Sequence, residues 1–169
     1  MQNLRVAYSR GSGVLSWLIR LCTHSNVNHT LFLVDENGTE MVIGADWNGL
    51  AMQTRTRWER KGNRVIDTPQ LVRSVDDGIP FLLNSLDKPY DYTGLLGMPI
   101  VLAGRFWFHK RWKNVFASRR ALFCSESAAL MFKYVGYPMA NLLDPSSTDP
   151  ALLRHWQRQV VDHEEAVSS

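Results

Sequence analysis

The stretch HTLFLVDENGTEMVI, residues 29–43, carries the clearest secondary-structure signal in the sequence. Two apolar runs rich in strand-favouring residues flank Asn37-Gly38, a dipeptide that supplies the positive φ angles of a tight hairpin turn. The stretch therefore predicts a β-hairpin whose first strand begins at His29. If the hairpin turns at Asn37-Gly38, His29 should lie roughly opposite Gly44 on the second strand. Asp46 would then be the nearest carboxylate on the same face, as a diagonal neighbour.

Strands and helices are also expected on both sides of this hairpin. Pro80 should divide a helix, Gly136 should end one and Asp149 should cap the start of another. Helices that accompany an antiparallel hairpin predict an α+β fold. The expected strands cover residues 4–8 and 64–67, and helical spacing of apolar residues covers 14–22, 69–86, 124–135 and 151–161.

Length and composition suit a single globular domain over residues 1–169. Hydrophobic residues make up 45% of the chain and charged residues 21%, values typical of folded proteins. A formal charge of +3 is too small to identify a partner. The two cysteines, Cys22 and Cys124, exclude a disulfide framework, and we expect neither a metal nor an organic cofactor.

Location is inferred from targeting signals. The first residues show no secretory signal peptide, and the longest apolar run, residues 93–104, is interrupted by Pro99 and too short to span a bilayer. We therefore expect a cytoplasmic protein.

Cys124 and His29 are the candidate reactive residues. Cys124 stands at the start of a predicted helix, where free N–H groups and the helix dipole stabilise a thiolate. A thiolate nucleophile needs a nearby base, and a histidine on a strand packed against that helix can serve as one. The alternative interpretation is that Cys124 is a small buried apolar residue and His29 an ordinary strand residue.

Several motifs together resemble a known family. They are SNVNHTLFL at 25–33, KPYDY at 88–92 and FCSES at 123–127, followed by YVGYP at 134–138. In order and spacing they resemble the permuted NlpC-type papain-like proteins, also called YiiX-like, which are related to the lecithin:retinol acyltransferase group. In that family, as here, the histidine strand precedes the cysteine helix. The resemblance implies a circularly permuted papain-like fold, with the cysteine helix packed on an antiparallel sheet.

The resemblance also implies a cysteine-dependent amidase, peptidase or acyl hydrolase that acts through an acyl-enzyme thioester on a peptide-like or lipid-like substrate. Cys124 would be the nucleophile and His29 the base, and the hydroxyl of Tyr90 would help to hold the oxyanion. The family often carries a glutamate where this chain has Gly44. Asp46 is therefore the candidate third residue, with Glu40 second. A dyad, a water or carbonyl in that role, or a binding module without activity would also fit.

Residues 105–120 form an aromatic and cationic segment that contains no acidic residue. Such a segment could rest on anionic lipid, hold a phosphate-bearing substrate or stack on single-stranded nucleic acid. The simplest interpretation is a helix that buries its aromatic side chains and solvates its basic face. A binding module that uses this segment for lipid or another anionic ligand is the main alternative to an enzyme, and nucleic acid is the least expected partner.

Overall fold

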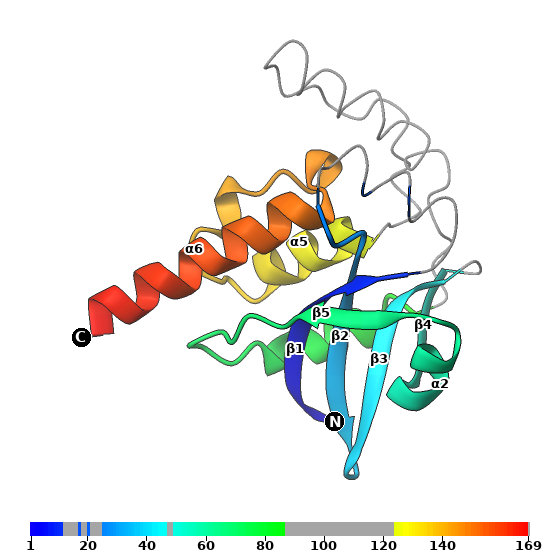
Figure 1. Ribbon diagram of the computed structural model, residues 1–169. Coiled ribbons are helices and arrows are strands. Elements are labelled where there is room, and N and C mark those ends of the chain that lie inside the picture. The colour runs from blue at the N-terminus through cyan, green and yellow to red at the C-terminus, as the bar shows by residue number, and fades with distance from the viewer. Residues whose placement is uncertain (12–16, 18–19, 21–24, 47–48, 87–123, 169) are drawn as a thin grey trace.

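The computed structural model describes residues 1–11, 17, 20, 25–46, 49–86 and 124–168 (Figure 1). Its centre is a five-stranded antiparallel sheet with the order β4-β3-β2-β1-β5. Together with the surrounding helices, the sheet establishes an α+β fold. The strands are β1 (Gln2–Arg10), β2 (His29–Glu36), β3 (Thr39–Asp46), β4 (Gly49–Thr54) and β5 (Arg64–Asp67).

The hairpin predicted from residues 29–43 is confirmed as β2 and β3. Asn37 and Gly38 form its turn with positive φ angles of 50° and 79°. The expected register, however, is wrong. Gly44 pairs with Leu31 rather than with His29. A two-residue turn at Asn37-Gly38 pairs Glu36 with Thr39 and fixes every later pair, whereas a His29–Gly44 pair would need a turn centred one residue earlier.

The helices agree with the sequence in part. α5 confirms the helix predicted over 124–135, and β1 and β5 confirm the two predicted strands. α6 confirms the helix predicted over 151–161 but continues to Ser168. The helix predicted over residues 69–86 is wrong for its first half, since helical structure there begins only at Asp76. β4 and α2 were not predicted. The helical elements are α2 (Arg55–Arg60), η1 (Asp76–Gly78), α3 (Ile79–Leu83), α5 (Cys124–Tyr134), η2 (Ala140–Leu142), η3 (Pro145–Ser147) and α6 (Pro150–Ser168).

Pro80 stands at the start of α3 instead of dividing a longer helix. Both ends predicted for the later helices are confirmed. Gly136 follows α5 with a φ of 63°, and the N–H of Tyr137 reaches back to the carbonyl of Phe132 at 2.9 Å, as in a Schellman motif. Asp149 caps α6 by accepting a hydrogen bond from the N–H of Leu152 at 2.9 Å.

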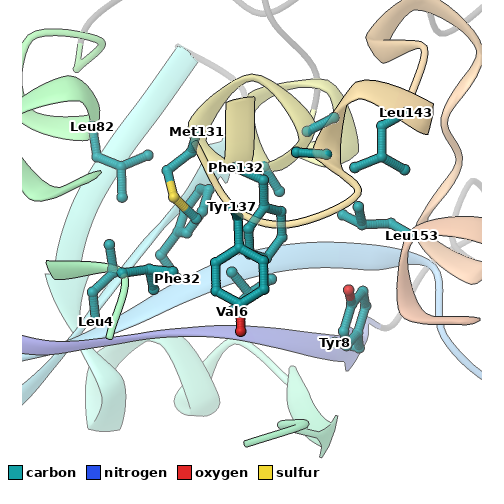
Figure 2. Close-up of a cluster of buried hydrophobic side chains, with 14 of the residues drawn as sticks. Leu4, Val6, Tyr8, Phe32, Leu82, Met131, Phe132, Tyr137, Leu143 and Leu153 are labelled. Atoms are coloured by element: carbon teal, nitrogen blue, oxygen red, sulfur yellow. The ribbon is translucent and has the colours of Figure 1, made fainter. Parts of the chain in front are cut away.

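The main hydrophobic core lies between one face of the sheet and α5 and α6 (Figure 2). Phe132 of α5 is fully buried at its centre and makes edge-on contacts with Tyr137 and Trp156 at 5.5 and 5.0 Å between ring centroids. Burial of such aromatic side chains fixes α5 on the sheet. The strands contribute Leu4, Val6, Tyr8, Phe32 and Val34 to this core.

The opposite face of the sheet carries a smaller core. Leu31 and Leu33 of β2 pack there with Ala7, Val42 and the buried Trp58 of α2. Side chains alternate between the two faces along a strand. Leu31 and Leu33 therefore belong to the face of Trp58, and even-numbered residues such as Thr30 belong to the face covered by α5.

Polar contacts fix α6 against β1 and β5. The buried hydroxyl of Tyr8 donates to Oε1 of Gln157 at 2.7 Å, and burial raises the pKa of this tyrosine well above its ordinary value. Asp67 of β5 accepts from Arg154 at 2.6 Å and from Arg158 at 2.7 Å. The C-terminal helix is thus held to the sheet by both apolar packing and charged hydrogen bonds.

Several predictions fall outside the described residues. Cys22, Tyr90 and the cationic segment 105–120 lie outside them, as does most of the helix predicted over 14–22, of which Trp17 and Arg20 are described as helical. In the described part of the chain, none of the helices has the length and apolar character needed to cross a membrane.

Candidate active site

Cys124 is the first residue of α5, and its position is fixed by contacts of the helix's first turn. The hydroxyl of Ser127 donates to the Cys124 carbonyl at 2.9 Å. The hydroxyl of Ser125 donates to the carbonyl of Thr148 at 2.6 Å, which ties the start of α5 to the segment before α6. Cys124 is only 7% exposed. The helix dipole and free N–H groups at this end favour negative charge on the sulfur.

His29 is the first residue of β2, and the chain on either side of it is pinned to β1. It pairs with Ser9 in the β1–β2 ladder. The N–H of Asn28 donates to the Ser9 carbonyl at 3.0 Å, and Oδ1 of Asn28 accepts from the N–H of Gly11 at 2.9 Å. These bonds fix the backbone from which the imidazole projects.

The structure brings Cys124 and His29 together, although 94 residues separate them in the sequence. The thiol makes a hydrogen bond with the His29 side chain, and the backbone N–H groups of Thr30 and Ser125 also donate to the sulfur. Burial by itself raises the pKa of the Cys124 thiol. The charge and hydrogen bond of His29 and the two N–H groups outweigh burial, so the thiol pKa lies below its ordinary value.

Gly44 gives the His29 ring the space that it occupies. A Cβ atom at this position of β3 would lie 3.4 Å from Nε2 of His29 and 3.4 Å from Cβ of Leu31. A glycine inside a strand often marks a close approach by another group, and here that group is the imidazole. Position 44 therefore lies directly beside the histidine ring.

Of the remaining predicted site residues, Glu40 is the one whose side chain the structure describes, and it lies away from this pair. Glu40 pairs with Asp35 near the turn and binds Arg5 at 2.8 Å and also Arg55, so its carboxylate is engaged away from His29. Asp46 ends β3, and the observed register, continued by two residues, would place its Cα opposite that of His29. The side chain of Asp46 and the whole of Tyr90 lie outside the described residues.

Sequence reasoning missed the groups that complete the sulfur's surroundings. The N–H of Thr30 is a backbone group, and its direction depends on how β2 packs against α5. The residue types in the sequence do not predict that packing. The N–H of Ser125 belongs to the free N–H groups of a helix start, so the predicted start at Cys124 was a usable signal. Asn28 was also missed, although asparagine commonly hydrogen-bonds to nearby backbone.

The arrangement has the chemistry of an activated thiol. A buried sulfur with a lowered pKa, an imidazole in hydrogen-bond contact and backbone N–H donors can form a thiolate–imidazolium pair. Among the described residues no group of three or more His, Cys, Asp or Glu side chains could hold a metal ion. Comparison with known proteins adds no family, because no protein-family model matches the sequence and no curated protein is significantly similar to it.

Proposed function

We propose that the chain is a cysteine-dependent hydrolase of the permuted papain-like type, with Cys124 as nucleophile and His29 as base. The observation that carries the proposal is the hydrogen bond between the Cys124 thiol and the His29 side chain at the start of α5, where the thiol pKa is lowered. The antiparallel sheet with α5 packed on it, and the histidine strand that precedes the cysteine helix, fit the fold that the sequence motifs resemble.

The proposed reaction has two stages. His29 takes the thiol proton, and the thiolate attacks the carbonyl carbon of an amide or ester. The C–N or C–O bond breaks as the leaving group takes the proton from the imidazolium, which leaves a thioester on Cys124. Water, deprotonated by His29, then hydrolyses the thioester and regenerates the thiol. Backbone N–H groups at the start of α5 are suited to hold the negative oxygen of each tetrahedral intermediate.

The substrate class follows from the same proposal. Peptide-like and lipid-like acyl compounds are the expected substrates, and Tyr90, Asp46 and the cationic segment 105–120 are proposed to assist at the oxyanion, at the imidazole and at an anionic part of the substrate or a membrane surface. The expected cytoplasmic location remains a prediction.

Alkylation by iodoacetamide tests the thiolate directly. Cys124, identified by peptide mass, should react rapidly near neutral pH. In His29→Ala the thiol stays buried but loses its largest stabilising partner, so its pKa should rise. Because each pKa unit changes the thiolate fraction tenfold, the rate near neutral pH should fall by at least about tenfold. His155→Ala, which removes an exposed histidine of α6, is the matched control and should react like the wild type.

A non-catalytic binding module on the same scaffold is the second candidate function. It is favoured by Gly44, which leaves no polar side chain at the position beside Nε2 of His29. Fluorophosphonate-like and chloromethyl-ketone probes with peptide or lipid groups separate the two candidates. Covalent labelling of Cys124 that depends on His29 supports the hydrolase. A thiol that reacts slowly, equally in the wild type and in His29→Ala, contradicts it.

A further inference from the structure

Thr30 brings a second polar group, its hydroxyl, to the neighbourhood of the Cys124 sulfur. Its backbone N–H already donates to that sulfur. In the β1–β2 ladder Thr30 pairs with Tyr8, which belongs to the main core, so the Thr30 side chain lies on the sheet face that α5 covers. The residue therefore has its N–H at the sulfur and its side chain on the sheet face that the cysteine helix covers.

Among the residues that the structure describes, the Thr30 hydroxyl is buried without a hydrogen-bond partner. The residue is 1% exposed, and Oγ1 has no partner in the described part of the chain. A buried polar group without a partner destabilises the fold, and valine would fill the same space without that cost. Buried unpartnered groups are rare in native proteins, and a catalytic role is one of the recognised reasons for them.

We propose that Thr30 is a further catalytic residue, whose hydroxyl donates a hydrogen bond to the Cys124 sulfur once the thiol has lost its proton to His29. This inference rests on the proposed function. A neutral thiol is a weak acceptor, whereas a thiolate is a charged acceptor that attracts a nearby donor strongly. A change of χ1 between staggered positions reorients the Thr30 oxygen. The hydroxyl keeps its own proton throughout, and the thiol proton stays on His29.

The pH dependence of Cys124 alkylation tests this role. Thr30→Val removes the hydroxyl and keeps the branched shape and the backbone N–H. The midpoint of the rate–pH profile should move upward by about one pH unit, which is the expected effect of one lost hydrogen bond to a charged group. Thr30→Ala should shift in the same direction, and Thr30→Ser, which restores the hydroxyl, should return the midpoint close to that of the wild type.

The matched control is Trp156→Phe, which removes another buried polar group without a partner, the Nε1–H on α6. Its midpoint should match that of the wild type. A Thr30→Val profile that superimposes on the wild type, with an equal or higher Tm, would show an idle buried hydroxyl and overturn the inference. Equal shifts in Thr30→Ser and Thr30→Ala would overturn it too, because packing rather than the hydroxyl would be responsible.

The failure of this inference is distinguishable from failure of the proposed function. Wild-type Cys124 that reacts rapidly and loses its reactivity in His29→Ala, together with an unshifted Thr30→Val profile, removes only the role of Thr30. Wild-type Cys124 that does not react as a thiolate removes the charged acceptor on which both proposals depend.

Discussion

Substitutions at Gly44 should distinguish two effects: crowding of the His29 ring, which changes Cys124 reactivity, and a change in the stability of the sheet. In Gly44→Ala the added Cβ would lie 3.4 Å from Nε2 of His29 and from Cβ of Leu31. The favourable separation of such atoms is about 3.5–4.0 Å, so the alanine fits after a shift of a few tenths of an ångström. Alanine also relieves part of the conformational cost of a glycine in a strand, about 0.5–1 kcal/mol. We expect nearly unchanged stability and Cys124 reactivity.

Gly44→Val should have a different effect. Its methyl groups extend about 1.5 Å beyond Cβ, and a β-branched side chain has few alternative χ1 positions, so the His29 ring must move. Overpacking of this kind costs about 1–3 kcal/mol. A ring displaced from the sulfur no longer lowers the thiol pKa, and a rise of one unit or more reduces alkylation near neutral pH by at least about tenfold.

The assay is the rate of iodoacetamide alkylation at Cys124, read by peptide mass, alongside the Tm of each variant. Ala51→Val is the control, because Ala51 pairs with Gly44 from the next strand and the same side chain is added farther from the imidazole. The control should keep wild-type reactivity. A folded Gly44→Val protein that alkylates as fast as the wild type would refute the reasoning, since the ring would then have room that the structure does not show.

Two predictions concern stability. Asp67→Asn should destabilise the fold by about 1–2 kcal/mol near neutral pH, because it weakens the charged hydrogen bonds to Arg154 and Arg158. Burial raises the pKa of Asp67, but the two arginines lower it by more, so the net pKa lies below the ordinary carboxyl value. The contribution of Asp67 to stability is therefore complete above the ordinary carboxyl pKa and is lost as pH falls through the lowered pKa. Urea unfolding should therefore show the two proteins converging in acid, and a constant difference would contradict this. Gly136→Ala should lower stability by about 1 kcal/mol through its φ of 63° alone, since its Cβ would meet no atom within 4 Å. Thermal unfolding with no loss of Tm would contradict that estimate.

Local signals account for the parts of the fold that the sequence predicted correctly. Asn37-Gly38, Gly136 and Asp149 each act within a few residues of the turn or helix end that they define, so their effect can be read without knowing the rest of the structure. The expected pairing of His29 with Gly44 was wrong because it did not follow from that turn: a two-residue turn at Asn37-Gly38 pairs Glu36 with Thr39 and therefore Leu31 with Gly44.

Long-range contacts explain why the first half of the helix predicted over residues 69–86 does not form. The carboxylate of Asp76 accepts hydrogen bonds from the N–H groups of Asn3 at 3.2 Å and Leu4 at 2.6 Å, which fixes this part of the chain to the start of β1. Leu71 and Val75 pack on the main core without a helix to carry them. Their spacing in the sequence matches a helical period and so predicted a helix. The tertiary contacts hold this segment in a non-helical conformation instead.

In the candidate site, too, local signals predict some features and long-range packing decides the others. Cys124 at a helix start and His29 at a strand start could be proposed from the sequence, because the motifs around them resemble one family and each lies at a recognisable element end. The N–H of Thr30 and the closeness of Gly44 to the imidazole depend on how α5 and β3 meet the first residues of β2. The residue types in the sequence do not predict how these elements pack together.

The hydrogen bond from Ser125 to the carbonyl of Thr148 has a consequence for the newly made chain. Synthesis proceeds from the N-terminus, so His29 and the sheet are available to fold before the support of the cysteine helix has left the ribosome. The bond from Ser125 to Thr148 can form only after residues 144–149 have been made and have docked. A chain that ends before Thr148 would therefore lack this anchor for the first turn of the cysteine helix.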